Sequence, residues 1–141
     1  MVPLPIVFDP GKEGLEKVLR DYQIEALRVV WANAERGVTS REVWESVKRA
    51  LEGVKTISRA SIINFLNAMC DDGILRYKEE TCKGGMRRKY FPALDEEGFK
   101  KYIAQTVIES LLRDFPEQTL EAIREALSRH PELADKLRSL I

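Results

Sequence analysis

Apolar residues recur every three or four positions through most of the chain, which is the spacing of amphipathic helices. A first run extends from Leu15 to Trp31, with a break allowed near Asp21, because aspartate is a competent N-cap residue. A second helix is expected after the capping box Thr39-Ser40-Arg41-Glu42, and a third after Ser58. A glycine follows each helix as a C-terminal stop. The first half of the chain is therefore predicted to hold three helices.

The period of the pattern changes to two after the third helix. Residues Ile74 to Lys78 alternate apolar and basic side chains, as a strand does, and Arg87 to Phe91 form a return strand that Pro92 closes. The segment Cys82-Lys83-Gly84-Gly85 between them has turn chemistry, since its glycines reach positive φ without a steric penalty. These features predict a β-hairpin whose tip and return strand are basic.

Further helices are expected after Asp95, at Pro116 and at Pro131, because proline fits the first position of a helix. Three helices followed by a hairpin is the order of elements in a winged helix. The predicted fold class is mainly α with a small β-hairpin wing, a winged helix-turn-helix followed by C-terminal dimerisation helices. The expected parts are an N-terminal arm over residues 1–14, a winged-helix DNA-binding domain over 15–93 and a helical dimerisation region over 94–141.

Charge is sorted along the chain, although its 23 basic and 23 acidic residues cancel overall. The segment from Arg36 to Phe91 holds 12 basic and 7 acidic residues, a net charge of +5. The segments before and after it carry −2 and −3. A positive middle between acidic ends indicates a local polyanion-binding surface. The helix-turn-helix pattern of this segment makes double-stranded DNA the leading candidate for the polyanion.

Contacts to DNA are expected from the Ser58 helix and from the hairpin. The second helix of a helix-turn-helix enters the major groove with its N-terminal residues toward the bases, and its free amides favour phosphate. Arg59 suits phosphate or guanine, and Ser61 and Asn64 suit base edges or phosphates, although ordinary solvated positions are the alternative. The hairpin cations would follow the phosphate backbone, or they are only a solvated face. The predicted DNA-binding residues are Thr39, Arg41, Ser58, Arg59, Ser61, Asn64, Lys83, Arg87, Arg88 and Lys89, with Lys48, Arg49 and Lys55 as less secure extensions.

The apolar stripe from Phe99 to Leu112 is broader than one neighbouring helix would cover. Packing onto the winged helix is one explanation, and burial against the same segment of a second chain is the favoured one. A twofold dimer would then contact two related half-sites. The predicted interface residues are Phe99, Ile103, Val107, Leu111, Leu120, Ile123 and Leu127.

Other chemistry has little support in the sequence. Without an apolar stretch long enough to span a membrane or a good signal peptide, a cytoplasmic location is expected. Cys70, Cys82 and the lone His130 do not form a metal-ligand pattern, and Gly84-Gly85 indicates only a turn. A redox switch at Cys82 stays open as a minor alternative. We expect no metal, no cofactor and no enzymatic activity.

Several segments together resemble the BlaI/MecI/CopY-type penicillinase-repressor family. They are Leu27-Arg28-Val29-Val30-Trp31, Val38-Thr39-Ser40-Arg41-Glu42-Val43, Ser61-Ile62 through Leu66, Gly73-Ile74-Leu75 and Tyr90-Phe91-Pro92. The resemblance implies a homodimeric transcriptional repressor that binds an inverted-repeat operator. Asp71-Asp72 departs from the family, whose members often carry basic residues there. The C-terminal cysteine motif of the copper-responsive branch is absent, so copper sensing is not implied.

Two other functions remain open at the level of sequence. A winged helix can serve as a protein-interaction module in a larger assembly, where the basic wing would meet an acidic partner. A ligand-sensing regulator or small enzyme would need a pocket with polar groups between the winged helix and the C-terminal helices.

Overall fold

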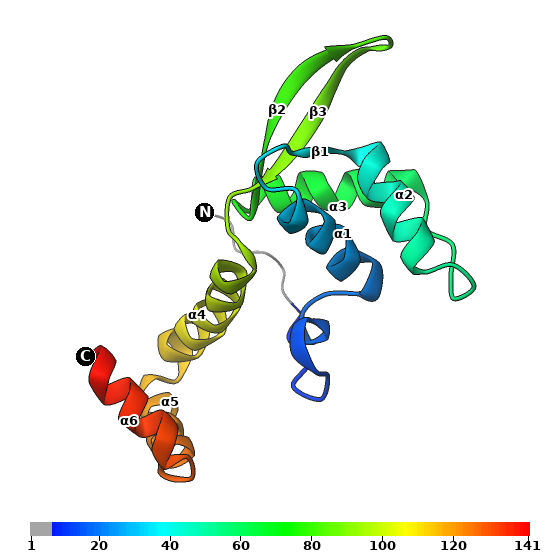
Figure 1. The fold of residues 1–141 in the computed structure, drawn as a ribbon. Coiled ribbons are helices and arrows are strands. Elements are labelled where there is room, and N and C mark those ends of the chain that lie inside the picture. The colour runs from blue at the N-terminus through cyan, green and yellow to red at the C-terminus, as the bar shows by residue number, and fades with distance from the viewer. Residues whose placement is uncertain (1–6) are drawn as a thin grey trace. The chain divides into compact units, whose positions relative to one another are not determined.

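A computed structural model describes residues 7–141, so residues 1–6 of the predicted N-terminal arm lie outside the described residues. The predicted fold class is confirmed, with helices predominating over a small antiparallel sheet (Figure 1). The elements are η1 (Gly14–Lys17), α1 (Asp21–Ala32), β1 (Val38–Thr39), α2 (Ser40–Ala50), α3 (Arg59–Asp71), β2 (Leu75–Cys82), β3 (Gly85–Pro92), α4 (Glu96–Asp114), α5 (Pro116–Ser128) and α6 (Pro131–Leu140).

The chain divides into two compact units, Met1–Lys101 and Tyr102–Ile141. The first unit contains the helix-turn-helix, the sheet and the start of α4. The second contains the rest of α4 with α5 and α6. Helix α4 therefore begins in one unit and continues into the other.

Helices α1, α2 and α3 enclose the core of the first unit, because each carries one apolar stripe. The stripe predicted for α3 is buried as expected, at Ile62, Phe65, Leu66 and Met69. The core is completed by apolar side chains of α1, α2 and the base of the sheet, which include Leu27, Val30, Val38, Val43, Val47, Ile74 and Leu75.

Side-chain caps fix the starts of α2 and α3. The Thr39 hydroxyl accepts from the Glu42 amide at 3.2 Å, and the Glu42 carboxylate accepts from the Thr39 amide at 3.1 Å, which confirms the capping box. Burial raises the pKa of Glu42, but the bonds from Thr39 and Arg36 outweigh it and leave that pKa below its ordinary value. Ser58 caps α3 by accepting from the Ser61 amide at 3.1 Å.

The first predicted helical run is interrupted, as the sequence allowed. Arg20, and not Asp21, is the N-cap of α1, and Asp21 is its first residue. The Arg20 amide donates to the Gln23 side chain at 2.9 Å. The expected N-cap at Asp21 is thus displaced by one residue, because the Gln23 side chain satisfies the amide that precedes Asp21.

The sheet is antiparallel and has the strand order β1-β3-β2. Both hairpin strands are longer than the pattern predicted, and they are joined at the paired residues Cys82 and Gly85. Gly85 has φ +117°, whereas Gly84 is not among the glycines with positive φ, so one glycine of the turn needs this conformation and not both. Strand β1, whose residues pair with Tyr90 and Lys89, was not predicted.

Gly37 lies where the loop after α1 meets the base of the wing. It has φ +78°, a conformation that L side chains rarely adopt. A Cβ atom at this position would lie 2.6 Å from two carbons of the Phe91 ring. Glycine at this position therefore allows the loop and the sheet to pack closely.

Aromatic packing fixes the start of α4 to α1. The rings of Trp31 and Phe99 lie 6.0 Å apart, and the Trp31 indole N–H donates to the carbonyl of Leu94 at 3.0 Å. Phe99 is 0% exposed. Unlike the exposed residues predicted for the dimer interface, Phe99 is buried within its own chain, where Trp31 contacts it.

The second unit buries little of its own apolar surface. Among the described residues of this unit, the buried side chain is that of Thr119. Of the predicted interface residues, Leu111 and Leu120 are exposed, whereas Ile103, Val107, Ile123 and Leu127 are half-buried. Other exposed apolar side chains are Ile108, Phe115, Leu133, Leu137, Leu140 and Ile141. An uncovered apolar surface of this kind is typical of a protein–protein interface.

Candidate nucleic-acid interface

The N-terminal end of α3 carries exposed polar groups. Arg59 is the first residue of the helix and is exposed, and no acidic residue of the described chain pairs with it. The hydroxyls of Ser58 and Ser61 bond to each other at 2.9 Å. Asn64 is exposed about one turn further along. The geometry therefore offers an unpaired guanidinium and a free amide beside the positive end of a helix dipole.

Two predicted residues at the start of α2, its N-cap Thr39 and Arg41, are occupied by contacts within the protein. Thr39 is 6% exposed, and its hydroxyl is part of the capping box. The Arg41 guanidinium lies 3.2 Å from the Glu45 carboxylate, one turn along the same helix, and both side chains are exposed. The geometry favours Thr39 as a residue that orients α2, and it leaves Arg41 able to exchange a weak surface ion pair for another anion.

The register of the hairpin divides its charges between two faces, because successive residues of a strand point to opposite sides. We call one side the outer wing face, made of Arg76, Lys78, Glu80, Arg87, Lys89 and Phe91. Its four cations face one carboxylate, that of Glu80, which pairs with Arg87 at 2.6 Å. The outer wing face thus keeps a net charge of +3.

The base of the outer wing face is organised around an aromatic ring. The Arg76 guanidinium lies 4.7 Å from the centre of the Phe91 ring, and the Lys78 ammonium lies 5.3 Å from it. Lys78 and Lys89 are direct neighbours across the strands. Like charges in this position are destabilising, so the presence of Lys78 and Lys89 favours a role for them other than stabilising the protomer.

The opposite side, the inner wing face, consists of Tyr77, Glu79, Thr81, Met86, Arg88 and Tyr90. Here Arg88 stacks on Tyr77, with its guanidinium carbon 3.9 Å from the ring centre. Its Nη1 donates to the Asn67 side chain of α3 at 3.0 Å, and the Tyr90 hydroxyl donates to the same oxygen at 2.6 Å. The four hairpin cations predicted as one group are therefore separated, with Arg88 directed toward α3.

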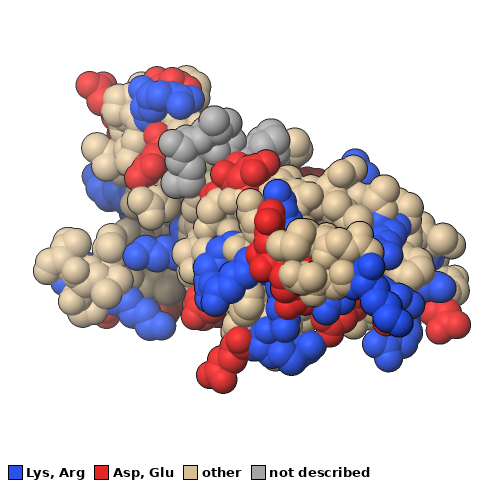
Figure 2. Space-filling view, turned by 90° about the horizontal axis from the view of Figure 1, so that it is seen from above, with Lys and Arg blue, Asp and Glu red and all other residues tan. Residues whose placement is uncertain are grey.

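Charge pairing leaves most of the basic middle segment without acidic partners. Of the 12 basic residues between Arg36 and Phe91, ion pairs hold four, namely Arg36, Arg41, Lys55 and Arg87. Figure 2 shows Lys and Arg side chains spread over the visible face and interleaved with Asp and Glu. On the face in that view, Lys and Arg side chains do not form a patch of one sign.

The C-terminal end of α3 is acidic and contains a thiol. Burial raises the pKa of Asp72, and the neighbouring Asp71 raises it further. Burial also raises the pKa of the Cys70 thiol to about 11, against the opposing effect of Arg88. Cys70 therefore stays a neutral thiol near neutral pH and has none of the thiolate character of a reactive cysteine.

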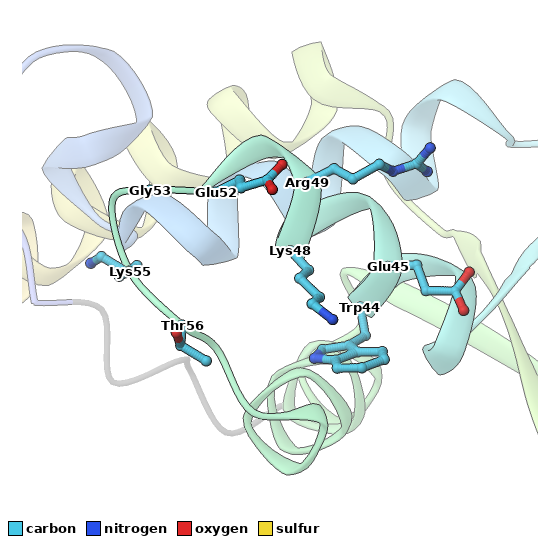
Figure 3. A pocket seen from close by; sticks show the side chains of 8 residues that line it. All are labelled: Trp44, Glu45, Lys48, Arg49, Glu52, Gly53, Lys55 and Thr56. Atoms are coloured by element: carbon cyan, nitrogen blue, oxygen red, sulfur yellow. The ribbon is translucent and has the colours of Figure 1, made fainter.

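An open hollow of about 570 Å³ lies beside the connector between α2 and α3. The Trp44 indole N–H donates to the Ile57 carbonyl at 2.9 Å, and the Lys48 ammonium lies 5.0 Å from the Trp44 ring centre. Figure 3 shows Lys48 extending toward Trp44, whereas Arg49 points away from it. The Lys55 bond to Asp21, 3.0 Å long, holds the pKa of that carboxyl below its ordinary value. Lys55 is thereby less available to an outside anion than Lys48 or Arg49.

A second open groove, of about 440 Å³, is lined by Val18 and Leu19, which follow η1, and by residues of α1, α3 and α4 that include Phe99. Ser61 and Asn64 line it together with apolar side chains such as Phe65. Within residues 7–141, no group of His, Cys, Asp and Glu side chains is placed to hold a metal ion. None of the helices described combines the length and the apolar character needed to cross a membrane.

Comparisons with known proteins identify the family of this chain. The sequence profile of the penicillinase repressor family matches residues 20–141. This chain belongs to the penicillinase repressor family. The match confirms the resemblance found in the sequence and places the chain in a family of transcriptional repressors.

A solved structure agrees with the fold of this penicillinase-repressor family member. A protein of Methanosarcina mazei, described as a possible transcriptional regulator, has a TM-score of 0.53 at 12% identity over 73% of this chain and 78% of its own. A weaker likeness is to a protein of Thermoplasma acidophilum, provisionally described as a transcriptional regulator, with a TM-score of 0.42 at 17% identity over 65% and 93% of the two chains. No curated protein sequence matches the chain.

The structure brings together residues that the sequence analysis did not include in the site. Arg76 and Lys78 share the outer wing face with Arg87 and Lys89, and Asn67 joins α3 to the wing. The alternation of Arg76 and Lys78 with apolar residues was visible in the sequence and could have assigned both to this face. No local signal could have found Asn67, because its partners are on another element.

Proposed function

We propose that this penicillinase-repressor family member is a homodimer that binds double-stranded DNA at an inverted-repeat operator and represses transcription. Helix α3 contacts base edges through Arg59 and Asn64, and the N-terminal end of this helix holds a phosphate. The outer wing face follows the backbone of the same half-site. Thr39 and Ser58 orient the two helices of the motif, and Ser61 contributes a hydroxyl beside the phosphate.

The observation that carries this proposal is the arrangement of unpaired cations in the first unit. The exposed guanidinium at the start of α3 and the +3 outer wing face belong to one compact unit. Their positions suit groove contact by a helix and backbone contact by a wing. An acidic protein partner would also meet the positive charge, but it would give no reason for unpaired polar groups at the helix N-terminus.

Dimerisation is supported by the second unit. Its helices leave Leu111, Phe115, Leu120 and Leu133 exposed, which is unfavourable for a protomer in water. A second copy of the same helices would cover these side chains with a self-complementary surface. The resulting twofold symmetry matches an operator of two inverted half-sites.

Selection of bound genomic duplexes by the purified full chain tests the proposed function. The expected result is a recovered motif made of two inverted half-sites, because each protomer would place one α3 in a major groove. Recovery of duplexes with no common motif would contradict it and favour a protein-interaction module, for which duplex sequence would not matter. A motif with a single half-site would retain DNA binding but contradict the dimer.

Replacing Lys89 by glutamine is expected to weaken DNA binding without harming the fold. The change relieves the repulsion between Lys78 and Lys89, so the free energy of unfolding should stay the same or rise by less than about 1 kcal/mol. In a dimer it removes two phosphate contacts, which should reduce the slope of log affinity against log salt by about 2. Fluorescence anisotropy titrations on a selected duplex at several salt concentrations measure this slope.

Lys101→Gln is the matched control for that measurement, because it makes the same charge change at an exposed position of α4. The control should keep the salt slope of the original protein. Equal slopes for Lys89→Gln and Lys101→Gln would remove the outer wing face from the DNA contact.

A further inference from the structure

One polar cluster joins the wing to the helix proposed to enter the groove. The side-chain oxygen of Asn67 accepts from Arg88 at 3.0 Å and from the Tyr90 hydroxyl at 2.6 Å. The Arg88 guanidinium is at the same time stacked on Tyr77, 3.9 Å from the ring centre. Asn67 and Arg88 are half-buried and Tyr90 is 2% exposed, so these bonds are partly shielded from water. Burial raises the pKa of Tyr90, so its hydroxyl remains a donor near neutral pH.

Arg88 makes this contact although an acidic alternative is close by. Glu79 lies directly opposite Arg88 across the strands, yet Arg88 forms no ion pair with it in the described residues. The guanidinium plane is instead fixed on one side by the Tyr77 ring and at one end by Asn67. A planar, stacked guanidinium with a fixed bond loses little further freedom in holding two elements together.

We propose that Arg88 and Asn67 form a strut that sets the angle between the wing and α3, and that Arg88 is a positioning residue and not a phosphate contact. The effect of the strut on DNA binding rests on the proposed function. Whether the strut holds the wing to α3 can be tested without DNA.

The position of the strut along the hairpin explains its effect. Tyr90 is the last fully buried residue of β3 toward the tip, and the strand continues from there to Gly85. Five residues of strand span about 17 Å. Without the Arg88 contact, the last contact of β3 toward the tip is the pairing of Lys89 with Thr39 of β1. A tilt of about 10° at that point moves the tip by about 2–3 Å, a large part of the roughly 3.4 Å rise of one nucleotide. The strut thereby keeps Lys83 and the outer wing face in register with the same phosphates.

The test compares three variants of the full chain by ¹⁵N relaxation at the amides of Gly84 and Gly85. Asn67→Ala removes the acceptor, and Arg88→Lys keeps the charge but loses the planar stacked group. Glu79→Gln is the matched control, since it changes the residue opposite Arg88 and leaves the strut intact. Thermal unfolding of each variant verifies that it is folded at the measuring temperature, and Arg88→Lys keeps the Asn67–Tyr90 bond if Asn67→Ala proves unstable.

The expected result is a fall in the order parameters of the tip from about 0.85 toward about 0.6 in Asn67→Ala and Arg88→Lys, with no change in Glu79→Gln. On a selected duplex, Asn67→Ala and Arg88→Lys should each bind about fivefold more weakly than the original protein. The double variant that combines them should bind no more weakly than either, because both substitutions break the same link between Arg88 and Asn67. Their salt slopes should equal that of the original protein.

Unchanged order parameters of the Gly84 and Gly85 amides in both strut variants would overturn the proposal, whatever the variants do to DNA binding. A fourth variant, Arg88→Gln, removes the charge and is used in the salt titrations. Original affinity in Arg88→Lys with a lower salt slope in Arg88→Gln would instead make Arg88 a phosphate contact. Failure of the original protein to prefer any duplex would contradict the proposed function, and the tip order parameters would then decide by themselves whether the strut exists.

Discussion

Leu120→Asp is expected to convert the proposed dimer into monomers and to abolish tight binding to the proposed operator. Leu120 of α5 is 61% exposed within its own chain, so the change removes little packing from the protomer. In a twofold interface two leucines are lost, each contributing about 1.5–3 kcal/mol of burial. The dissociation constant of the dimer should rise about a hundredfold to ten-thousandfold. Burial of an unpaired carboxylate would add to this loss.

Sedimentation velocity over a range of protein concentrations measures the dimer directly. Val54→Asp is the control, because Val54 is 72% exposed in the connector between α2 and α3 and receives the same acidic group. The control should sediment like the original protein. A Leu120→Asp protein that dimerises as tightly as the control would show that this face of α5 is not the interface.

Gly37→Ala is expected to lower the free energy of unfolding by about 2–5 kcal/mol. A left-handed backbone at alanine costs about 1–2 kcal/mol. Overlap of the new methyl with the Phe91 ring adds about 1–3 kcal/mol, since the ring is held in the core. The loss is a large part of the roughly 5–15 kcal/mol that stabilises a typical domain. Urea unfolding followed by circular dichroism measures it.

Gly53→Ala separates the two contributions to this loss. Gly53 has φ +81°, close to the value at Gly37, but a Cβ atom there would meet no atom within 4 Å. This variant should lose only the backbone contribution of about 1–2 kcal/mol. An equal loss in both variants would show that the loop and the Phe91 ring are not in close contact in solution.

The sequence predicted those features whose cause lies within a few residues. The capping box of Thr39 and Glu42, the Ser58 cap, and the helices that begin at Pro116 and Pro131 all follow from local hydrogen bonding or from the fixed φ of proline. The interruption of the first helical run near Asp21 is of the same kind. Such features do not depend on the rest of the fold.

Features that depend on distant partners were missed. Strand β1 has two residues, too few to show an alternating pattern, and it exists because Tyr90 and Lys89 pair with it. Phe99 shares its stripe with residues of the second unit, and only the position of Trp31 shows that it belongs to the core of the first. The outer half of β2 is polar on both faces, so its length was not apparent.

The sequence grouped the candidate residues by their positions along the chain, whereas the structure shows how their side chains are organised. The sequence indicated the Ser58 helix and the basic hairpin, and both lie in the first unit. It grouped Arg87, Arg88 and Lys89 together because they are adjacent in the chain. Strand geometry separates them, since alternate residues point to opposite faces of the hairpin. Arg88 therefore points toward Asn67, on the face opposite to that of Arg87 and Lys89.

The dependence of duplex affinity on salt, measured for the full chain on a selected duplex and on a scrambled one, tests the central claim most directly. If about six phosphates are neutralised per dimer, log affinity should fall with log salt at a slope of about −5. The selected duplex should bind at least about a thousandfold more tightly than the scrambled one. Affinity that is equal for the two duplexes, or that does not change with salt, would contradict the account.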